Sequence, residues 1–149
     1  MNQENYRLGK KSELRLIGVN PVLAFAAQEA IKITEQDFSA FEGVRLLERQ
    51  RVLVARGVSW TMNSNHLTGN AIDLVAYTNG KLSWDTSGGS YDMISKAMKT
   101  VIEKYDLPIE WGFDKWGKDE AHWQMKKGVS TWDIRNILNQ HQLSAMIRR

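Results

Sequence analysis

Cysteine is absent from the 149-residue sequence, which excludes thiolate metal sites, disulfides and cysteine nucleophiles. Any bound metal ion must therefore be held by histidine and carboxylate side chains, and the chain has only three histidines. Apolar runs as long as a membrane span are also missing, and residues 1–6 lack the apolar stretch of a secretory signal. We therefore expect a protein that does not insert into a membrane and that stays in the cytoplasm where it is made.

Proline is scarce as well, and neither Pro21 nor Pro108 marks a linker. Apolar residues make up 42% of the chain and charged residues 25%, as in ordinary soluble proteins. The length indicates one domain over 1–149 with a core at about 12–138. The net charge of +3 favours adsorption to a polyanion such as bacterial wall polymer or nucleic acid, or serves solubility alone. The six tryptophans form no basic-aromatic ladder, so we expect no nucleic-acid partner, and we expect a monomer.

Hydrophobic periodicity predicts both helices and strands. The pair Asn79-Gly80 predicts a hairpin turn, and residues 59–68, 85–90 and the Trp/Gly/Lys segment after residue 111 are predicted to be loops. Helices come first and an antiparallel meander with an inserted helix follows. This order indicates an α+β fold, with a small antiparallel sheet, helices packed on one side and the metal site on the open face. The predicted helices cover 12–17, 21–33, 46–55, 91–105 and 130–138, and the predicted strands cover 38–45, 71–77, 81–84, 109–111 and 121–125.

His66, Asp73 and His122 are candidates for the ligands of a catalytic zinc ion. Such an ion usually takes three nitrogen or carboxylate ligands from the protein and keeps a fourth position for water. Asp73 lies in an apolar run, where a carboxylate is costly unless it is paired or metal-bound. The alternative is an edge strand with one solvated face. His66 alone is an ordinary loop residue, but Gly69 lies between it and Asp73 and permits the chain to fold back.

Strand alternation places His122 and Gln124 on one face and Trp123 and Met125 on the other, which is a natural core face. His122 then points toward a site or toward water, and a surface histidine beside a core tryptophan is the alternative. The carboxylate of Asp119, three residues earlier, is a candidate for the base that a zinc-bound water needs. If the predicted strand extends back by one residue, alternation would instead bring Glu120 to the face of His122, so both carboxylates remain candidates.

Two sequence patterns together resemble the M15 family of zinc peptidases. These patterns are Ser-x-His-x-x-Gly-x-Ala-x-Asp and Asp-x-x-His-Trp, and the resemblance runs from about residue 12 to residue 124. The family includes bacterial D-alanyl-D-alanine carboxypeptidases and dipeptidases and phage L-alanyl-D-glutamate endolysins. Two departures are Ala121, where proline is common, and a helix at 46–55 without the usual tyrosine. The fixed positions are present as Ser64, His66, Gly69, Ala71, Asp73, Asp119, His122 and Trp123.

The resemblance implies a role for several of these side chains. His66, Asp73 and His122 would hold one Zn²⁺ ion, which polarises the scissile carbonyl and lowers the pKa of its water toward about 7. Asp119 would be the general base that takes a proton from this water and passes it to the leaving amine.

Four further residues are expected to complete the site. The resemblance implies that Arg45 stabilises the oxyanion or binds the substrate carboxylate, since its planar fork is permanently charged. Ser64 is placed to orient His66 by a hydrogen bond. Trp123 and Gln124, next to the last ligand, are expected to orient that ligand or to bind substrate.

The resemblance favours a zinc-dependent endolysin that hydrolyses the L-alanyl-D-glutamate bond of the bacterial peptidoglycan stem peptide. The sequence shows no obvious wall-binding module, a profile that resembles phage endolysins held in the host cytoplasm until the membrane is permeabilised. One alternative is a D-alanyl-D-alanine carboxypeptidase or dipeptidase with the same site. Another is a non-catalytic wall-binding protein of the same fold, which would be expected to have lost a ligand or the base.

Overall fold

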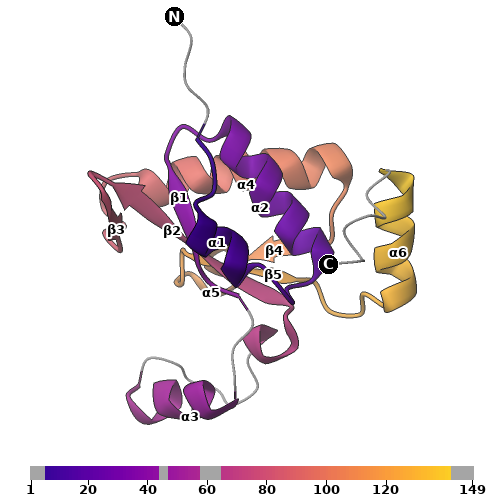
Figure 1. The fold of residues 1–149 in the computed structure, drawn as a ribbon, viewed down its shortest axis with the longest axis horizontal. Helices are drawn as coiled ribbons and strands as arrows, with labels where there is room; N and C mark the ends of the chain where they lie inside the picture. The colour runs from indigo at the N-terminus through magenta and orange to yellow at the C-terminus, as the bar shows by residue number, and fades with distance from the viewer. Residues whose placement is uncertain (1–5, 44–46, 58–64, 142–149) are drawn as a thin grey trace, which may run out of the picture.

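A computed structural model describes residues 6–43, 47–57 and 65–141, and they form an open antiparallel sheet with helices, an α+β fold (Figure 1). The strands surround a long central strand, and the segment that carries α3 reaches away from the sheet (Figure 1). The helices are α1 (Lys10–Arg15), α2 (Pro21–Ile33), α3 (Leu47–Ala55), α4 (Ser90–Tyr105), α5 (Gly112–Trp116) and α6 (Thr131–Gln140), with a 3₁₀ turn η1 (Asn65–Thr68). The strands are β1 (Phe38–Glu42), β2 (Ala71–Thr78), β3 (Lys81–Ser83), β4 (Ile109–Trp111) and β5 (His122–Met125).

The sheet has the order β1-β2-β5-β4, and β3 pairs with the far end of β2 through the Asn79-Gly80 turn. Both turn residues have positive φ angles, which this kind of hairpin requires. β5 enters the sheet late in the chain but lies between β2 and β4. This position brings the C-terminal segment directly beside the strand that carries Asp73.

On one face of the sheet α2 and α4 pack on each other, α4 also packs on β2, and buried residues of all three elements share one core. Alternate β2 residues Ile72, Leu74 and Ala76 are fully buried in this core. Asn20 caps α2 by accepting a hydrogen bond from the Val22 backbone N–H at 3.0 Å. Asp73, between two core residues on β2, therefore points to the other face of the sheet. The expected arrangement of helices on one side and polar site residues on the other is confirmed for α2 and α4.

The structure differs from the sequence prediction at several boundaries. The segment expected to be a loop after β4 contains α5, a helix too short for periodicity to reveal, which ends at Gly117 with φ of 71°. Residues 65–68, also expected to be loop, form η1. The first helix runs over Lys10–Arg15 instead of 12–17. β1 covers Phe38–Glu42 with a register irregularity between Ala40 and Glu42, and residues 44 and 45 of the predicted strand lie outside the described residues.

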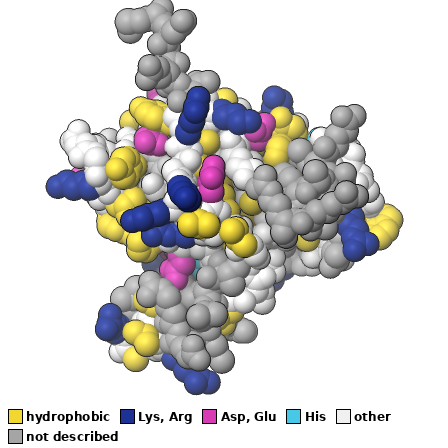
Figure 2. All heavy atoms as spheres, in the orientation of Figure 1, with side chains coloured by type: hydrophobic (Ala, Val, Ile, Leu, Met, Phe, Trp, Pro, Cys, Tyr) yellow, Lys and Arg dark blue, Asp and Glu magenta, His cyan; other side chains and the backbone are white. Residues whose placement is uncertain are grey.

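Basic side chains are dispersed among other residues on the face drawn in Figure 2, where the described Lys and Arg residues do not merge into one patch. Within residues 6–43, 47–57 and 65–141, every helix falls short of the length and apolar character that a membrane crossing requires.

Candidate metal centre

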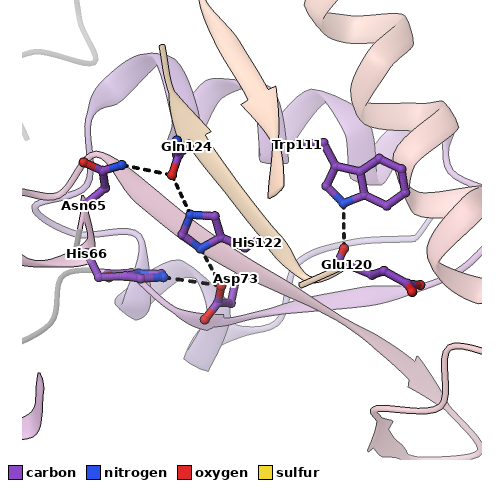
Figure 3. Close-up of polar contacts among 8 residues, drawn as sticks. Asn65, His66, Asp73, Trp111, Glu120, His122 and Gln124 are labelled. Carbon is purple, nitrogen blue, oxygen red and sulfur yellow. Dashed lines mark hydrogen bonds and ion pairs between the residues drawn. The ribbon is translucent and has the colours of Figure 1, made fainter. Parts of the chain in front are cut away.

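The side chains of His66, Asp73 and His122 converge on the face of the sheet opposite α2 and α4 (Figure 3). One ligand atom from each residue lies within 4.8 Å of the other two. His66 Nε2 and His122 Nδ1 each lie 3.4 Å from Asp73 Oδ1. The two imidazole rings meet edge to face with centroids 5.0 Å apart. The structure therefore brings together all three residues that the sequence named as ligands.

Local backbone geometry explains how two of these residues meet. Gly69 has a φ of 75°, a left-handed conformation that glycine adopts without strain, and the Asn70 N–H donates to the Asn65 carbonyl at 2.9 Å. This turn folds η1 back beside the start of β2. His66 is consequently placed over Asp73, as the glycine between them led us to expect.

Strand register supplies the third residue. Asp73 of β2 is directly opposite His122 of β5, and directly opposed residues on antiparallel strands project to the same face. The Leu74 N–H donates to the Ala121 carbonyl at 2.8 Å, which extends the pairing by one more bond. A shift of the register by one residue would move His122 to the core face.

His66 is oriented by a backbone carbonyl. Its Nδ1 lies 2.9 Å from the Gly43 oxygen, so a proton on Nδ1 is donated there and the Nε2 lone pair faces Asp73. Gly43 is also a close-approach position, because a Cβ added there would lie 2.1 Å from the Arg15 backbone oxygen. The end of β1 thus reaches the site only because this residue has no side chain.

His122 is oriented by a side-chain amide. Its Nε2 lies 2.9 Å from Gln124 Oε1, which also accepts a hydrogen bond from Asn65 Nδ2 at 2.9 Å (Figure 3). Gln124 Nε2 in turn donates to Glu110 Oε1 at 2.8 Å. The acceptor on Gln124 favours a proton on His122 Nε2, which leaves the Nδ1 lone pair toward Asp73.

Burial and mutual charge set the electrostatics of the group. Burial disfavours the ionised Asp73 carboxylate, but hydrogen bonds and charge from His122 and His66 outweigh it and hold the pKa of Asp73 well below its usual range. Burial also opposes a charge on His122, yet the hydrogen bond and charge of Asp73 raise the pKa of His122 above its ordinary value. The carboxylate is thus ionised near neutral pH, as a metal ligand must be.

The two candidate bases lie in different surroundings. Asp119 has a φ of 68°, and its charge contributes to the raised pKa of His122, so the turn places it within electrostatic reach of that ring. Glu120 points away from the three ligand side chains (Figure 3). Burial and the charge of Asp92 raise the pKa of Glu120, while its backbone oxygen accepts from Trp111 Nε1 at 2.7 Å. Alternation, which favoured Glu120, fails here because the chain turns at Asp119 before β5 begins.

Gly112 brings α5 against this turn. A Cβ at Gly112 would lie 3.0 Å from the Asp119 backbone oxygen and 3.2 Å from His122 Cβ. Trp116, at the end of α5, has its ring centroid 5.3 Å from that of His122, and 37% of the residue is exposed. The metal group is therefore flanked on this side by an accessible aromatic ring.

Other residues named from the sequence lie elsewhere or outside the described part of the chain. Arg45 and Ser64 fall outside the described residues. Trp123 is 1% exposed and stacks on Trp111 in the core, on the face of β5 opposite His122. His141, to which the sequence assigned no function, contacts the Tyr105 carbonyl.

Three contacts near the metal group were not predicted from the sequence: the Gly43 carbonyl contacts His66, and Asn65 and Glu110 each form a hydrogen bond with Gln124. Asn65 lies next to His66 inside the first motif, so its position was a usable signal. Glu110 could have been found by extending the alternation argument to the strand before the last motif. Nothing in the sequence pointed to the Gly43 carbonyl.

The donor set suits a divalent cation. Two imidazole nitrogens and one carboxylate oxygen are a ligand set that proteins use for hydrolytic Zn²⁺. The second nitrogen of each ring already has a partner, so the remaining lone pairs converge with Asp73 Oδ1 on one point. Histidine and carboxylate donors also bind other transition metals, so the chemistry of the site fits a metal without selecting one.

Known proteins resemble this chain in fold or in sequence. The chain superposes on the crystal structure of the L-Ala D-Glu endopeptidase ChiX of Serratia marcescens with a TM-score of 0.74 and 36% identity, covering 83% of this chain and 92% of that one. The L-alanyl-D-glutamate peptidase of Escherichia phage T5 is 28% identical over 128 residues, 84% of this chain and 93% of the relative. The L-alanyl-D-glutamate peptidase of Listeria phage A118 is 37% identical over 93 residues, 61% of this chain and 31% of that longer relative.

The fold and the relatives define a hydrolase of the peptidase class. The profile of the phage L-alanyl-D-glutamate peptidase family matches residues 4–136, and the chain belongs to this family. The family resemblance that the two sequence motifs indicated is confirmed.

Proposed function

We propose that this protein is a Zn²⁺-dependent peptidoglycan peptidase that hydrolyses the L-alanyl-D-glutamate bond of the stem peptide. The observation that carries the proposal is the convergence of His66, Asp73 and His122 ligand atoms within 4.8 Å in a chain of this family. The names of the phage and Serratia relatives supply the bond. They favour it over the D-alanyl-D-alanine bond that the sequence left as an alternative.

In this proposal the zinc ion, when bound, polarises the scissile carbonyl and makes water a stronger acid. Asp119 takes the proton of the attacking water and delivers it to the leaving amine nitrogen. The charge of Asp119 already acts on His122, which supports a place beside the ion. Trp116 forms an exposed wall next to His122 and is placed to exclude water from one side of the substrate.

Two roles rest on the family resemblance alone. Arg45 would stabilise the oxyanion or bind a substrate carboxylate, and Ser64 would support His66. Gln124 differs, since its 2.9 Å contact with His122 supports a role in orienting that ligand. Trp123 is only 1% exposed, so in this proposal it does not bind substrate but packs in the core and holds β5, and with it His122, in place.

The proposed setting is that of an endolysin. The enzyme would remain in the host cytoplasm until the membrane is permeabilised and would then act on the wall as a monomer, with no nucleic-acid partner.

Digestion of purified peptidoglycan tests this function. The products are identified by mass spectrometry and by N-terminal labelling, for protein as purified, after chelation and after zinc is restored. We expect new N-terminal D-glutamate, lost on chelation and regained with zinc. Release of terminal D-alanine alone would establish the carboxypeptidase instead, and binding to the wall without any product would establish a binding protein.

A further inference from the structure

A row of polar side chains crosses the open face of the sheet from its edge to the metal centre. Glu110 of β4 is directly opposite Gln124 of β5, and Asp73 of β2 is directly opposite His122 of β5. Because Gln124 and His122 are two residues apart on one strand, all four side chains share a face. Hydrogen bonds join Glu110 to Gln124 at 2.8 Å and Gln124 to His122 at 2.9 Å.

The direction of these bonds depends on Glu110. A side-chain amide has a donor end and an acceptor end, whereas an ionised carboxylate only accepts. The Lys115 ammonium lies 3.4 Å from Glu110 Oε1, the oxygen that Gln124 Nε2 contacts. A carboxylate at this position therefore turns the NH₂ group of Gln124 toward β4. The Oε1 atom is left for His122, and it accepts from Asn65 as well.

We propose that Glu110 is a positioning residue for the metal centre, which acts through Gln124 to keep the proton of neutral His122 on Nε2. The inference rests on the proposed zinc site and adds a residue to it. A proton on Nε2 leaves the Nδ1 lone pair directed toward Asp73 Oδ1, 3.4 Å away, and so available to the proposed cation. In the opposite tautomer Nδ1 carries the proton, and this proton would have to leave Nδ1 before the nitrogen could bind a metal ion.

Glu110 has no direct contact with the ligand atoms in this arrangement, so its effect passes entirely through the amide. Gln124 is 2% exposed and its amide is held by hydrogen bonds to Asn65, His122 and Glu110, so an exchange of its two ends is the response that we expect. Glu110 itself keeps 24% of its side chain exposed beside a surface cavity of about 400 Å³. Replacement by glutamine preserves its size, but it removes the negative charge that pairs with Lys115 together with the restriction to accepting hydrogen bonds.

The variant Glu110→Gln is the first test. Glutamine can present either end to Gln124, so the amide is free to reverse and offer NH₂ to His122. We expect zinc affinity, measured by competition with a chromophoric chelator, to fall about 10-fold, within the range known for partners of metal-bound histidines. Glu103→Gln is the matched control, because Glu103 is exposed on α4 and lines the same cavity. It removes an equal charge and should change the affinity less than about 2-fold.

Nitrogen NMR of the metal-free protein gives a readout that does not depend on activity. The ¹⁵N shifts of the His122 ring, recorded above the midpoint of its own titration, report which nitrogen carries the proton. We expect the parent and Glu103→Gln proteins to show the Nε2–H form and Glu110→Gln to show a mixture of both forms. Thermal unfolding of each variant verifies that the fold is intact.

The double variant Glu110→Gln/Gln124→Glu restores an acceptor for His122 Nε2–H at position 124 without restoring a charge at position 110. Glutamine at 110 would donate to the new carboxylate at 124, which accepts from His122 Nε2–H and from Asn65. We expect the Nε2–H form and at least the parental zinc affinity to return.

The outcomes separate this inference from the proposed function. If the parent protein binds no zinc, the proposed metal site is wrong, yet the tautomer measurement still decides the role of Glu110. If Glu110→Gln keeps a pure Nε2–H ring and parental affinity, or loses no more affinity than Glu103→Gln, the inference is overturned. Failure of the double variant to regain the Nε2–H form overturns it as well.

Discussion

Asp73 and His122 lie directly opposite each other on β2 and β5, with Asp73 Oδ1 and His122 Nδ1 3.4 Å apart. The same oxygen of Asp73 lies 3.4 Å from His66 Nε2. One carboxylate atom is thus shared by two imidazoles that come from distant parts of the chain. The geometry makes Asp73 the common member of the group, and its substitution the most direct probe of metal binding.

Asp73→Asn keeps the size of the side chain and removes its charge. We expect zinc affinity to fall at least about 100-fold. Loss of a residue that only hydrogen-bonds to a metal ligand lowers the affinity by up to about 100-fold, and loss of a ligand should cost at least as much. Metal content after dialysis and calorimetric titration measure the effect. Asp114→Asn is the control, since Asp114 is an exposed aspartate of the nearby α5 that pairs with Lys99. Zinc retention by the Asp73 variant would show that the three residues do not form the ligand set.

Asp119→Asn distinguishes the two candidate bases. Asparagine tolerates the positive φ angle of 68° that this position requires, so the turn should persist. We expect kcat to fall by about 10²- to 10⁴-fold with zinc retained, as for loss of a general base. Glu120→Gln should stay close to the parent, because Glu120 points away from the ligands (Figure 3). The reverse ranking of the two variants would make Glu120 the base.

Gly112→Ala tests the packing of α5 on the turn that contains Asp119. The added methyl would lie 3.0 Å from both the Asp119 backbone oxygen and Trp116 Cζ3, so one of them must shift. We expect a loss of about 1–3 kcal/mol in the free energy of unfolding and a lower kcat. Gly88→Ala is matched to it, because nothing lies within 4 Å of a Cβ there and its φ is not positive. Equal effects of the two substitutions would contradict the close approach.

Zinc binding should depend on pH through His122. Asp73 raises the pKa of His122 in the metal-free protein, and a ring must lose its proton to bind metal. Zinc affinity should therefore decline as pH falls through a midpoint above the ordinary histidine value of 6.5. The pKa of Asp73 is lowered, so this carboxylate stays ionised and adds no transition near neutrality.

Calorimetry in buffers of different ionisation enthalpy measures this linkage. Proton release from His122 should accompany zinc binding below the midpoint and should vanish well above it. His141→Gln leaves the metal group unchanged and should give the same curve, because His141 contacts the Tyr105 carbonyl instead. A midpoint at or below 6.5 would contradict the influence assigned to Asp73.

Alternation within strands was sufficient to place some site residues from the sequence. The face shared by His122 and Gln124 follows from the period of a strand, and Asp73 stood out because a charge interrupts an apolar run. Both inferences use only neighbours in the chain. They hold here because β2 and β5 are regular over these residues.

Contacts between distant segments were beyond the reach of that reasoning. The Gly43 carbonyl meets His66 through the backbone, which carries no side-chain signal. The opposition of Glu110 and Gln124 depends on strand register, which the sequence does not state. The conformation of Asp119 likewise depends on a tight turn between α5 and β5, and α5 itself is only five residues long.

The place of β5 in the sheet has a consequence for synthesis of the protein. This strand follows almost all other elements in the chain, yet it is inserted between β2 and β4 and carries His122. A nascent polypeptide that ends before it holds only two of the three candidate ligands and an incomplete sheet. The topology thus withholds hydrolytic competence until translation of the fold is nearly finished, so ribosome-bound fragments would be inert toward the wall.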